Sequence, residues 1–171
     1  MVLNALACIT MCFKLGISKE KIHDLLKTFK NAKRRFAEEV FGDIITIDDY
    51  AHHPTEIKVT LEAARQKYPN KELVVVFKPN TYSRTEAFYN DFATAMNIAD
   101  KQYLTEIDCN RERSEDYKGV SSKLILDGLS NGEMISEETV EKLLAHNNAV
   151  ICFMSCASIS HLKEKYESYL K

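Results

Sequence analysis

The chain has 171 residues, of which 45% are hydrophobic and 28% are charged, ordinary values for a globular protein. Its length suits one large domain, or one domain with a fragment of a second. The net charge of −2 leaves no basic excess for binding nucleic-acid phosphates, and no apolar run approaches the roughly 20 residues that span a bilayer. We therefore expect no nucleic-acid partner and no membrane segment.

The five cysteines lie in separate, mostly apolar segments, at positions 8, 12, 109, 152 and 156. An odd number of such cysteines predicts reduced thiols and a cytoplasmic protein. Two pairs are spaced four residues apart, which raises the question of metal ligation. Neither pair has a second pair or a histidine at zinc spacing, so we predict no metal site.

The first 31 residues are predicted to form two helices. Apolar residues recur at helical spacing over residues 2–14, and Gly16 ends that helix. Ser18 is the expected N-cap of a second helix that runs to about residue 29. The basic stretch K-N-A-K-R-R, residues 30–35, follows as a connector. We place a domain boundary within it, between residues 31 and 32.

The remaining residues, 32–171, show strands that alternate with helices. A β-hairpin is expected over residues 36–47, with Gly42 and Asp43 at its turn. The later strands are expected at residues 73–77, 103–107, 134–135 and 149–154, and the helices at residues 54–68, 83–99, 121–129, 137–145 and 158–170. This alternation predicts an α/β fold: a Rossmann-like, mainly parallel sheet with helices on both faces, preceded by the short helical segment.

Three strand-to-helix turns carry unusual polar content. They read D-D-Y-A-H-H-P-T-E at residues 48–56, K-P-N-T-Y-S-R-T at residues 78–85, and E-I-D-C-N-R-E-R at residues 106–113. Parallel crossovers share one hand, so all three turns should open on one edge of the sheet, where ligands bind in such folds. Their carboxylates suit hydroxyl groups or a metal-bound nucleotide, and arginine suits a carboxylate or phosphate.

Each of these residues also has a purely structural interpretation. The two histidines are then simply exposed beside the start of a helix, Tyr50 lies in the core, and Arg35 is a solvated member of K-R-R. Arg84 pairs with Glu86 or Asp91 on the helix surface, and Asn4 is an exposed helix residue. The occurrence of all the polar turns in one chain, in one order, favours the functional interpretation.

That order also carries a resemblance to a known family. The stretches V-L-N-A-L-A, K-R-R-F, D-D-Y-A-H-H-P-T-E, K-P-N-T-Y-S-R-T, R-E and G-V-S-S follow the order and approximate spacing of the C-terminal part of a bacterial Mur ligase, over the whole chain. The doubled histidine resembles the alanine-adding members. The resemblance implies residues 1–31 as the last helices of the central ATPase domain and residues 32–171 as the C-terminal Rossmann-like domain.

The resemblance implies an activity and its residues. Such enzymes join L-alanine to UDP-N-acetylmuramate through an acyl phosphate, using ATP and Mg²⁺, in the synthesis of peptidoglycan precursors. The matching ATP-binding positions are Asn4, Arg35, Asp49 and His52, and those of the amino-acid pocket are Tyr50, Asn80 and Arg84. No phosphate-binding loop G-x-x-x-x-G-K-[ST] occurs here. We expect no complete catalytic set and no ATP or Mg²⁺ held by this chain alone, and its expected partners are the central ATPase and UDP-sugar-binding domains.

Several positions depart from the family pattern. Met1 stands where a second asparagine precedes Asn4, Asn80 replaces a histidine, and K-N-A replaces Gly-Gly-Val before K-R-R. S-C-A-S, residues 155–158, replaces Gly-Ala-Gly-Asp, with Ser158 still available as an N-cap. These departures leave open a divergent, non-catalytic paralogue or fragment that acts as an interaction or weak nucleotide-binding module. A free-standing nucleotide-binding domain is disfavoured, because no glycine-rich turn follows a strand.

Overall fold

The computed structural model describes residues 2–29, 32–109 and 111–171, without the side chains of Val2 and Leu3. The chain divides into two compact units, Met1–Ala32 and Lys33–Lys171. The predicted boundary lies one residue before this division. Met1, two residues of the predicted connector (Lys30 and Asn31) and one residue of the third polar turn (Asn110) lie outside the described residues.

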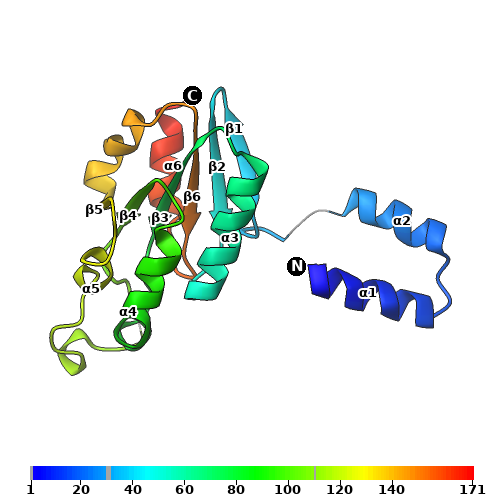
Figure 1. Cartoon of the computed structure of the whole chain (residues 1–171), viewed down its shortest axis with the longest axis horizontal. Helices are drawn as coiled ribbons and strands as arrows, with labels where there is room; N and C mark the ends of the chain where they lie inside the picture. Colours follow the sequence, from blue (N-terminus) through cyan, green and yellow to red (C-terminus); the bar gives the residue numbers. More distant parts are fainter. Residues whose placement is uncertain (1, 30–31, 110) are drawn as a thin grey trace. The chain divides into compact units, whose positions relative to one another are not determined.

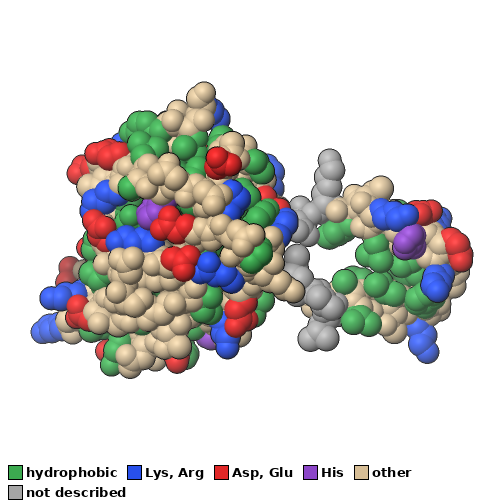
Figure 2. Space-filling view, turned by 45° about the horizontal axis from the view of Figure 1, so that its top comes forward, with side chains coloured by type: hydrophobic (Ala, Val, Ile, Leu, Met, Phe, Trp, Pro, Cys, Tyr) green, Lys and Arg blue, Asp and Glu red, His purple; other side chains and the backbone are tan. Residues whose placement is uncertain are grey.

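The first unit consists of helix α1 (Val2–Lys14) and helix α2 (Lys19–Thr28), which form a hairpin (Figure 1). Gly16 turns the chain between them with a φ of 79°, a left-handed conformation that glycine adopts without strain. The Ser18 side chain accepts a hydrogen bond from the Lys21 amide at 3.3 Å, which confirms the predicted N-cap. Apolar side chains gather on this hairpin (Figure 2), and the exposed ones are Leu6, Met11, Phe13, Leu15, Leu25, Leu26 and Phe29.

The second unit is built on a six-stranded sheet. Its strands are β1 (Ala37–Phe41), β2 (Ile44–Asp49), β3 (Glu72–Phe77), β4 (Lys101–Leu104), β5 (Gly132–Met134) and β6 (Ala149–Met154). They lie in the order β1-β2-β6-β3-β4-β5, and only the β1–β2 hairpin is antiparallel. The predicted α/β fold with a mainly parallel sheet is therefore confirmed.

Helices cover both faces of this sheet (Figure 1). Helices α3 (Pro54–Lys67), α4 (Tyr82–Met96) and α5 (Lys123–Leu126) pack on one face, together with strand residues such as Val75 and Phe77. The 3₁₀ helix η2 (Glu137–Ala145) and helix α6 (Ser160–Ser168) pack on the other, with Val74 and Val76. Alternate residues of β3 thus enter opposite cores, as the strand period of two requires.

Some boundaries differ from those predicted. Strand β4 ends at Leu104 rather than at residue 107, because its partner β3 ends at Phe77 and offers no further ladder. The segment after β4 leaves the sheet, and its described residues include a short 3₁₀ helix, η1 (Ser114–Asp116). The prediction of Ser158 as an N-cap was wrong: Ile159 precedes α6 and makes no side-chain cap. The Ser158 carbonyl instead accepts a hydrogen bond from Lys78.

The arrangement creates a crevice at one edge of the sheet. Strands β3 and β6 are neighbours, but α4 follows β3 on one face and α6 follows β6 on the other. The chain therefore diverges beyond the carboxyl ends of these two strands. Crevices of this kind are the usual ligand sites of doubly wound α/β sheets.

Candidate functional site

A polar cavity of about 390 Å³ opens at the carboxyl edge of the sheet. Its walls come from the segments that follow β2, β3, β4 and β6, which are far apart in the sequence. The lining residues are Tyr50, His52, Asn80, Thr81, Arg84, Asp108, Cys109, Arg111, Cys156, Ala157 and Ser158. All three polar turns contribute to it, so they meet at one edge of the sheet as predicted.

Arg84 is a cavity residue with an unsatisfied side-chain donor. Its Nη1 atom is buried and has no hydrogen-bond partner among the described residues, so the alternative in which Glu86 or Asp91 neutralises it at this atom does not occur. A buried donor without a partner costs about 1–3 kcal/mol, and more when it is charged. Arg84 also lines the cavity, and a guanidinium suits a carboxylate or a phosphate.

Tyr50 and Asn80 form two other parts of the wall. Tyr50 is 37% exposed, which excludes its alternative placement in the core. The Asn80 side chain donates through Nδ2 to the Asp108 carbonyl at 3.4 Å. Its Oδ1 and the second hydrogen on Nδ2 remain available, so Asn80 can offer a ligand both an acceptor and a donor.

His52 and His53 have different tasks in the turn before α3. His53 is the N-cap, and Glu56 completes a capping box by accepting from the backbone N–H groups of both histidines. The His52 Nδ1 donates to the Tyr50 carbonyl at 2.9 Å, which fixes the proton on Nδ1 because a carbonyl oxygen only accepts. His52 lines the cavity, whereas His53 stacks edge-on against Phe88 of α4.

The two arginines of K-R-R are used differently. Arg34 donates from Nη2 to the carbonyls of Ser155 and Ala157, at 2.5 and 3.1 Å, and from Nε to Asp48 at 3.3 Å. It thereby ties the start of this unit to the S-C-A-S turn. The Arg35 side chain makes no hydrogen bond or ion pair within the described part of the chain. Its guanidinium lies over the Tyr50 ring, 5.2 Å from the centroid, and its donors remain available.

Asp49 holds the backbone on both sides of Tyr50. The residue is 7% exposed, and its carboxylate accepts hydrogen bonds from the Phe36 and Ala51 amides, each at 2.8 Å. Burial raises the pKa of this carboxyl, although the two amides and the Arg35 charge oppose the rise. The left-handed backbone of Arg34 and Phe36, with φ of 56° and 53°, flanks Arg35, so Asp49 fixes the segment that presents Arg35.

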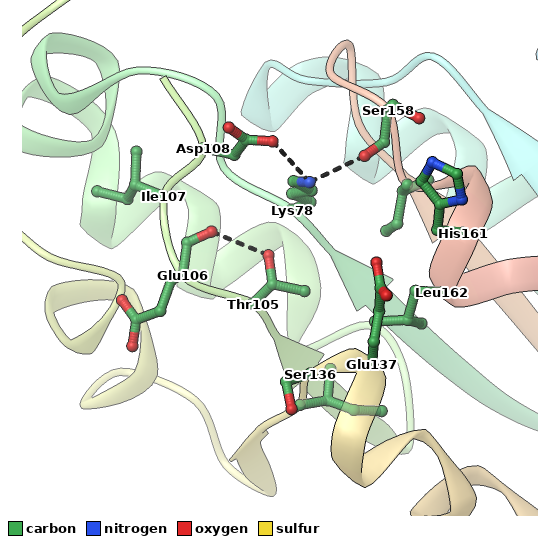
Figure 3. Close-up of a pocket in the computed structure, with 12 residues that line it drawn as sticks. Lys78, Thr105, Glu106, Ile107, Asp108, Ser136, Glu137, Ser158, His161 and Leu162 are labelled. Carbon is green, nitrogen blue, oxygen red and sulfur yellow. Dashed lines mark hydrogen bonds and ion pairs between the residues drawn. The ribbon is translucent and has the colours of Figure 1, made fainter. Parts of the chain in front are cut away.

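A second cavity, of about 320 Å³, adjoins the first (Figure 3). In the close-up, Lys78 lies between Asp108 and Ser158; its Nζ is 2.7 Å from Asp108 Oδ2 and 2.9 Å from the Ser158 carbonyl. Both partners also line the first cavity. The Lys78 bridge therefore belongs to the wall that the two cavities share, and it engages the Asp108 carboxylate.

The remaining predicted residue, Asn4, belongs to the helical unit, where its side chain is exposed on α1. Seven cavity residues were not among the predicted site residues: Thr81, Asp108, Cys109, Arg111, Cys156, Ala157 and Ser158. All seven lie in stretches that the sequence marked as polar turns or family departures. The role of Arg34 had no separate signal, because nothing in K-R-R distinguishes one arginine from the next.

Within residues 2–29, 32–109 and 111–171, no group of three or more His, Cys, Asp or Glu side chains is placed to hold a metal ion. The same described ranges contain no helix that is both long and apolar enough to cross a membrane.

The fold and the cavity define a class of protein: a doubly wound α/β domain with a polar cavity beyond the ends of β3 and β6, where such folds usually bind ligands. The family model of the Mur ligase glutamate ligase domain matches residues 34–155. The chain belongs to the Mur ligase family, and this part of it is the C-terminal domain.

Individual relatives agree with this assignment. A UDP-N-acetylmuramate–L-alanine ligase of Lactobacillus gasseri is 44% identical over 170 residues, which are 99% of this chain and 38% of that protein. The crystal structure of the UDP-N-acetylmuramate–alanine ligase of Thermotoga maritima matches with a TM-score of 0.79 and 28% identity, over 98% of this chain and 37% of that one. The T. maritima MurF ligase, crystallised with ADP, shares the fold at a TM-score of 0.73 and 21% identity, over 99% of this chain and 38% of that one. The chain thus spans less than two fifths of the length of these relatives.

Proposed function

We propose that this chain supplies the amino-acid-binding part of an ATP-dependent ligase that joins L-alanine to UDP-N-acetylmuramate, in the cytoplasmic synthesis of peptidoglycan precursors. Relatives that bear this activity in their names are 44% identical. Because the chain spans 38% of such a relative, we assign the whole reaction to this chain together with a central ATPase domain and a UDP-sugar-binding domain.

The same proposal divides the chain. Residues 1–31 are assigned to the end of the central ATPase domain and residues 32–171 to the C-terminal domain. The exposed apolar side chains of α1 and α2 support this division, because single exposed apolar residues are common but a gathered set is normally covered. The expected cover is the remainder of the central domain.

The observation that carries the proposal is Arg84, whose Nη1 has no hydrogen-bond partner among the described residues, in a cavity that Tyr50, His52 and Asn80 also line. Arg84 binds the alanine carboxylate, which supplies the missing anionic partner. The Asn80 Oδ1 accepts a hydrogen bond from the amino group. The cavity is larger than alanine requires, and the remaining space admits the activated carboxyl group that the amine attacks.

ATP supplies the phosphoryl group that activates the carboxylate of UDP-N-acetylmuramate. Among the residues of this chain, Arg35 fits its phosphates best, because the guanidinium keeps its donors and is braced by Tyr50. Asn4, Asp49 and His52 are assigned to the nucleotide as well, with Asp49 also holding the Arg35 segment. We assign no Mg²⁺ ligand to this chain. The role of its residues is to bind and orient the two reactants, an effect worth as much as about 7–11 kcal/mol in related chemistry.

The decisive experiment joins the chain to the two missing domains of a relative and measures phosphate release that depends on both ATP and L-alanine. We expect activity, and we expect Arg84→Ala to raise the KM for alanine at least tenfold, as loss of a charged hydrogen bond of about 1.5–3 kcal/mol requires. The KM for ATP should change less than about twofold, because Arg84 touches only the amino acid in this proposal. Glu86→Ala, at an exposed position on the same helix, is the matched control.

Failure has two distinguishable forms. An active fusion in which Arg84→Ala shifts both KM values equally removes Arg84 from the alanine site. An inactive but folded fusion favours the non-catalytic paralogue. A nucleotide titration of the isolated chain then tests whether it is a weak nucleotide-binding module.

A further inference from the structure

The first turn of α4, which carries Arg84, has no side-chain cap from its own N-cap residue. Thr81, the N-cap of α4, makes no side-chain cap, and its Oγ1 is buried without a partner among the described residues. The first amide groups of a helix need such acceptors. Phe88 then departs from helical geometry, with φ −130° and ψ 16°, so residues 82–87 join the rest of α4 through a kink. The Ser83 amide, near the start of this turn, therefore needs an acceptor from outside the helix.

Glu112 supplies the missing cap from another segment. Its Oε2 accepts a hydrogen bond from the Ser83 amide at 3.1 Å, and its Oε1 accepts one from the Ser83 hydroxyl at 2.5 Å. Five residues further on, the Tyr117 ring stacks on Tyr82 with centroids 5.9 Å apart. The segment after β4 is thereby fastened to the first turn of α4 at two points. A carboxylate also suits the positive end of the helix dipole.

The Glu112 carboxylate forms its hydrogen bonds with the start of α4 and not with the cavity. Glu112 does not line the cavity, and Arg84 acts on it only through its charge, without a hydrogen bond. Partial burial raises the pKa of Glu112, but the bonds from Ser83 and Tyr82 and the charge of Arg84 outweigh it and hold the pKa below the ordinary value. Glu112 therefore remains a carboxylate near neutral pH and does not neutralise the guanidinium.

We propose that Glu112 is a positioning residue of the site: it caps α4 from the segment after β4 and so holds Arg84 in the orientation that receives a ligand carboxylate. The same segment contributes Asp108, Cys109 and Arg111 to the cavity wall. The clamp, made of the Glu112–Ser83 and Tyr117–Tyr82 contacts, therefore also holds this segment against α4. The identity of the ligand as an amino acid rests on the proposed function. The clamp itself does not.

The test uses the full chain, the variants Glu112→Ala and Glu112→Gln, and Glu86→Ala as a control that removes the same charge from an exposed site on α4. Amide hydrogen exchange measured by NMR reports on the clamp, and a titration with L-alanine in the same spectra reports on the site. In Glu112→Ala we expect the Ser83 amide to exchange about tenfold faster and L-alanine to bind about tenfold more weakly, as loss of one charge-assisted hydrogen bond implies. Glu112→Gln should lie between, since one acceptor oxygen remains. Amides of β3 and β6 should be unaffected, which separates local release from unfolding.

Three results would overturn the inference or part of it. Unchanged exchange at Ser83 in Glu112→Ala excludes the clamp. Faster exchange with unchanged alanine affinity shows a cap that does not position Arg84. If the unmodified chain binds no L-alanine, the proposed ligand is wrong, and the NMR resonance of the Arg84 Nε–H then tests the clamp. The Nε–H should exchange faster with solvent in Glu112→Ala and at an unchanged rate in Glu86→Ala; any other result excludes the clamp.

Discussion

Arg34 and Arg35 are adjacent and chemically identical, yet the structure predicts that they contribute differently to stability. Replacing Arg34 with alanine removes two hydrogen bonds to the carbonyls of Ser155 and Ala157 and one to the Asp48 carboxylate. It leaves a partly buried carboxylate and two carbonyls without this donor. Replacing Arg35 removes a guanidinium that lies over the Tyr50 ring and whose charge acts on Asp49 without a hydrogen bond.

The magnitude for Arg34 follows from these contacts. Hydrogen bonds that involve a charged group contribute about 1.5–3 kcal/mol each, and because the Arg34 side chain is 24% exposed we take the lower value for the two carbonyls, about 3 kcal/mol together. The pair with Asp48, at 3.3 Å, adds at most about 1 kcal/mol. A loss of about 3–4 kcal/mol is a large part of the free energy of unfolding, which is typically about 5–15 kcal/mol. It corresponds to a fall in Tm of roughly 10 °C for a domain of this size.

Urea and thermal unfolding, followed by circular dichroism, measure this difference. For Arg35→Ala we expect a loss below about 1 kcal/mol, the worth of an exposed cation–π contact. Arg34→Gly should lose about 1 kcal/mol less than Arg34→Ala, because the φ of 56° at this position suits glycine. Equal losses for the two alanine variants, or a loss below 1 kcal/mol for Arg34→Ala, would refute the division of labour.

Two further predictions concern the cavity and its clamp. The pKa of Glu112 in the folded state lies below the ordinary 4.5, so the stability that its carboxylate contributes is complete above pH 4.5 and is lost as the pH falls through the folded-state pKa. In this acidic window the exchange rate of the Ser83 amide should approach the rate in Glu112→Gln. A ratio of the two exchange rates that stays constant at every pH would contradict the prediction. Cys109 and Cys156 line the cavity half-buried, whereas Cys152 is fully buried and its pKa is raised by burial. A small alkylating reagent, followed by mass spectrometry, should therefore label Cys109 and Cys156 more slowly when L-alanine is present, with the exposed Cys8 unaffected; equal rates would show that alanine does not occupy this cavity.

Much of the fold was predictable because its causes are local. Unbroken apolar runs at residues 73–77 and 149–154 mark strands buried on both faces, and both strands occur there. Boundaries that depend on tertiary neighbours were not predictable. Strand β4 stops where β3 stops, and Ser158 gives its carbonyl to Lys78 instead of capping α6. Neither fact is encoded in the segment that shows it.

The same difference between local and tertiary causes applies to the candidate site. Parallel topology alone brings the three polar turns to one edge, so the convergence of Tyr50, His52, Asn80 and Arg84 was foreseeable. The sequence could not separate residues that face a ligand from residues that hold them in place. Asp49 stands beside Tyr50 in D-D-Y, but its oxygens serve backbone amides, and Glu112 stands beside Arg111 but serves α4.

These holding residues share one physical cause. The cavity walls come from four separate segments, and each wall needs a contact that crosses from one segment to another, since irregular backbone does not fix its own geometry. Arg34 links the start of the unit to the turn after β6, Lys78 links the turn after β3 to those after β4 and β6, and Glu112 links the segment after β4 to α4. Charged side chains suit this task because a hydrogen bond to a charged group is stronger than a neutral one. The proposal for Arg84 rests on the same count, because its Nη1 has no hydrogen-bond partner among the described residues once these cross-links are included.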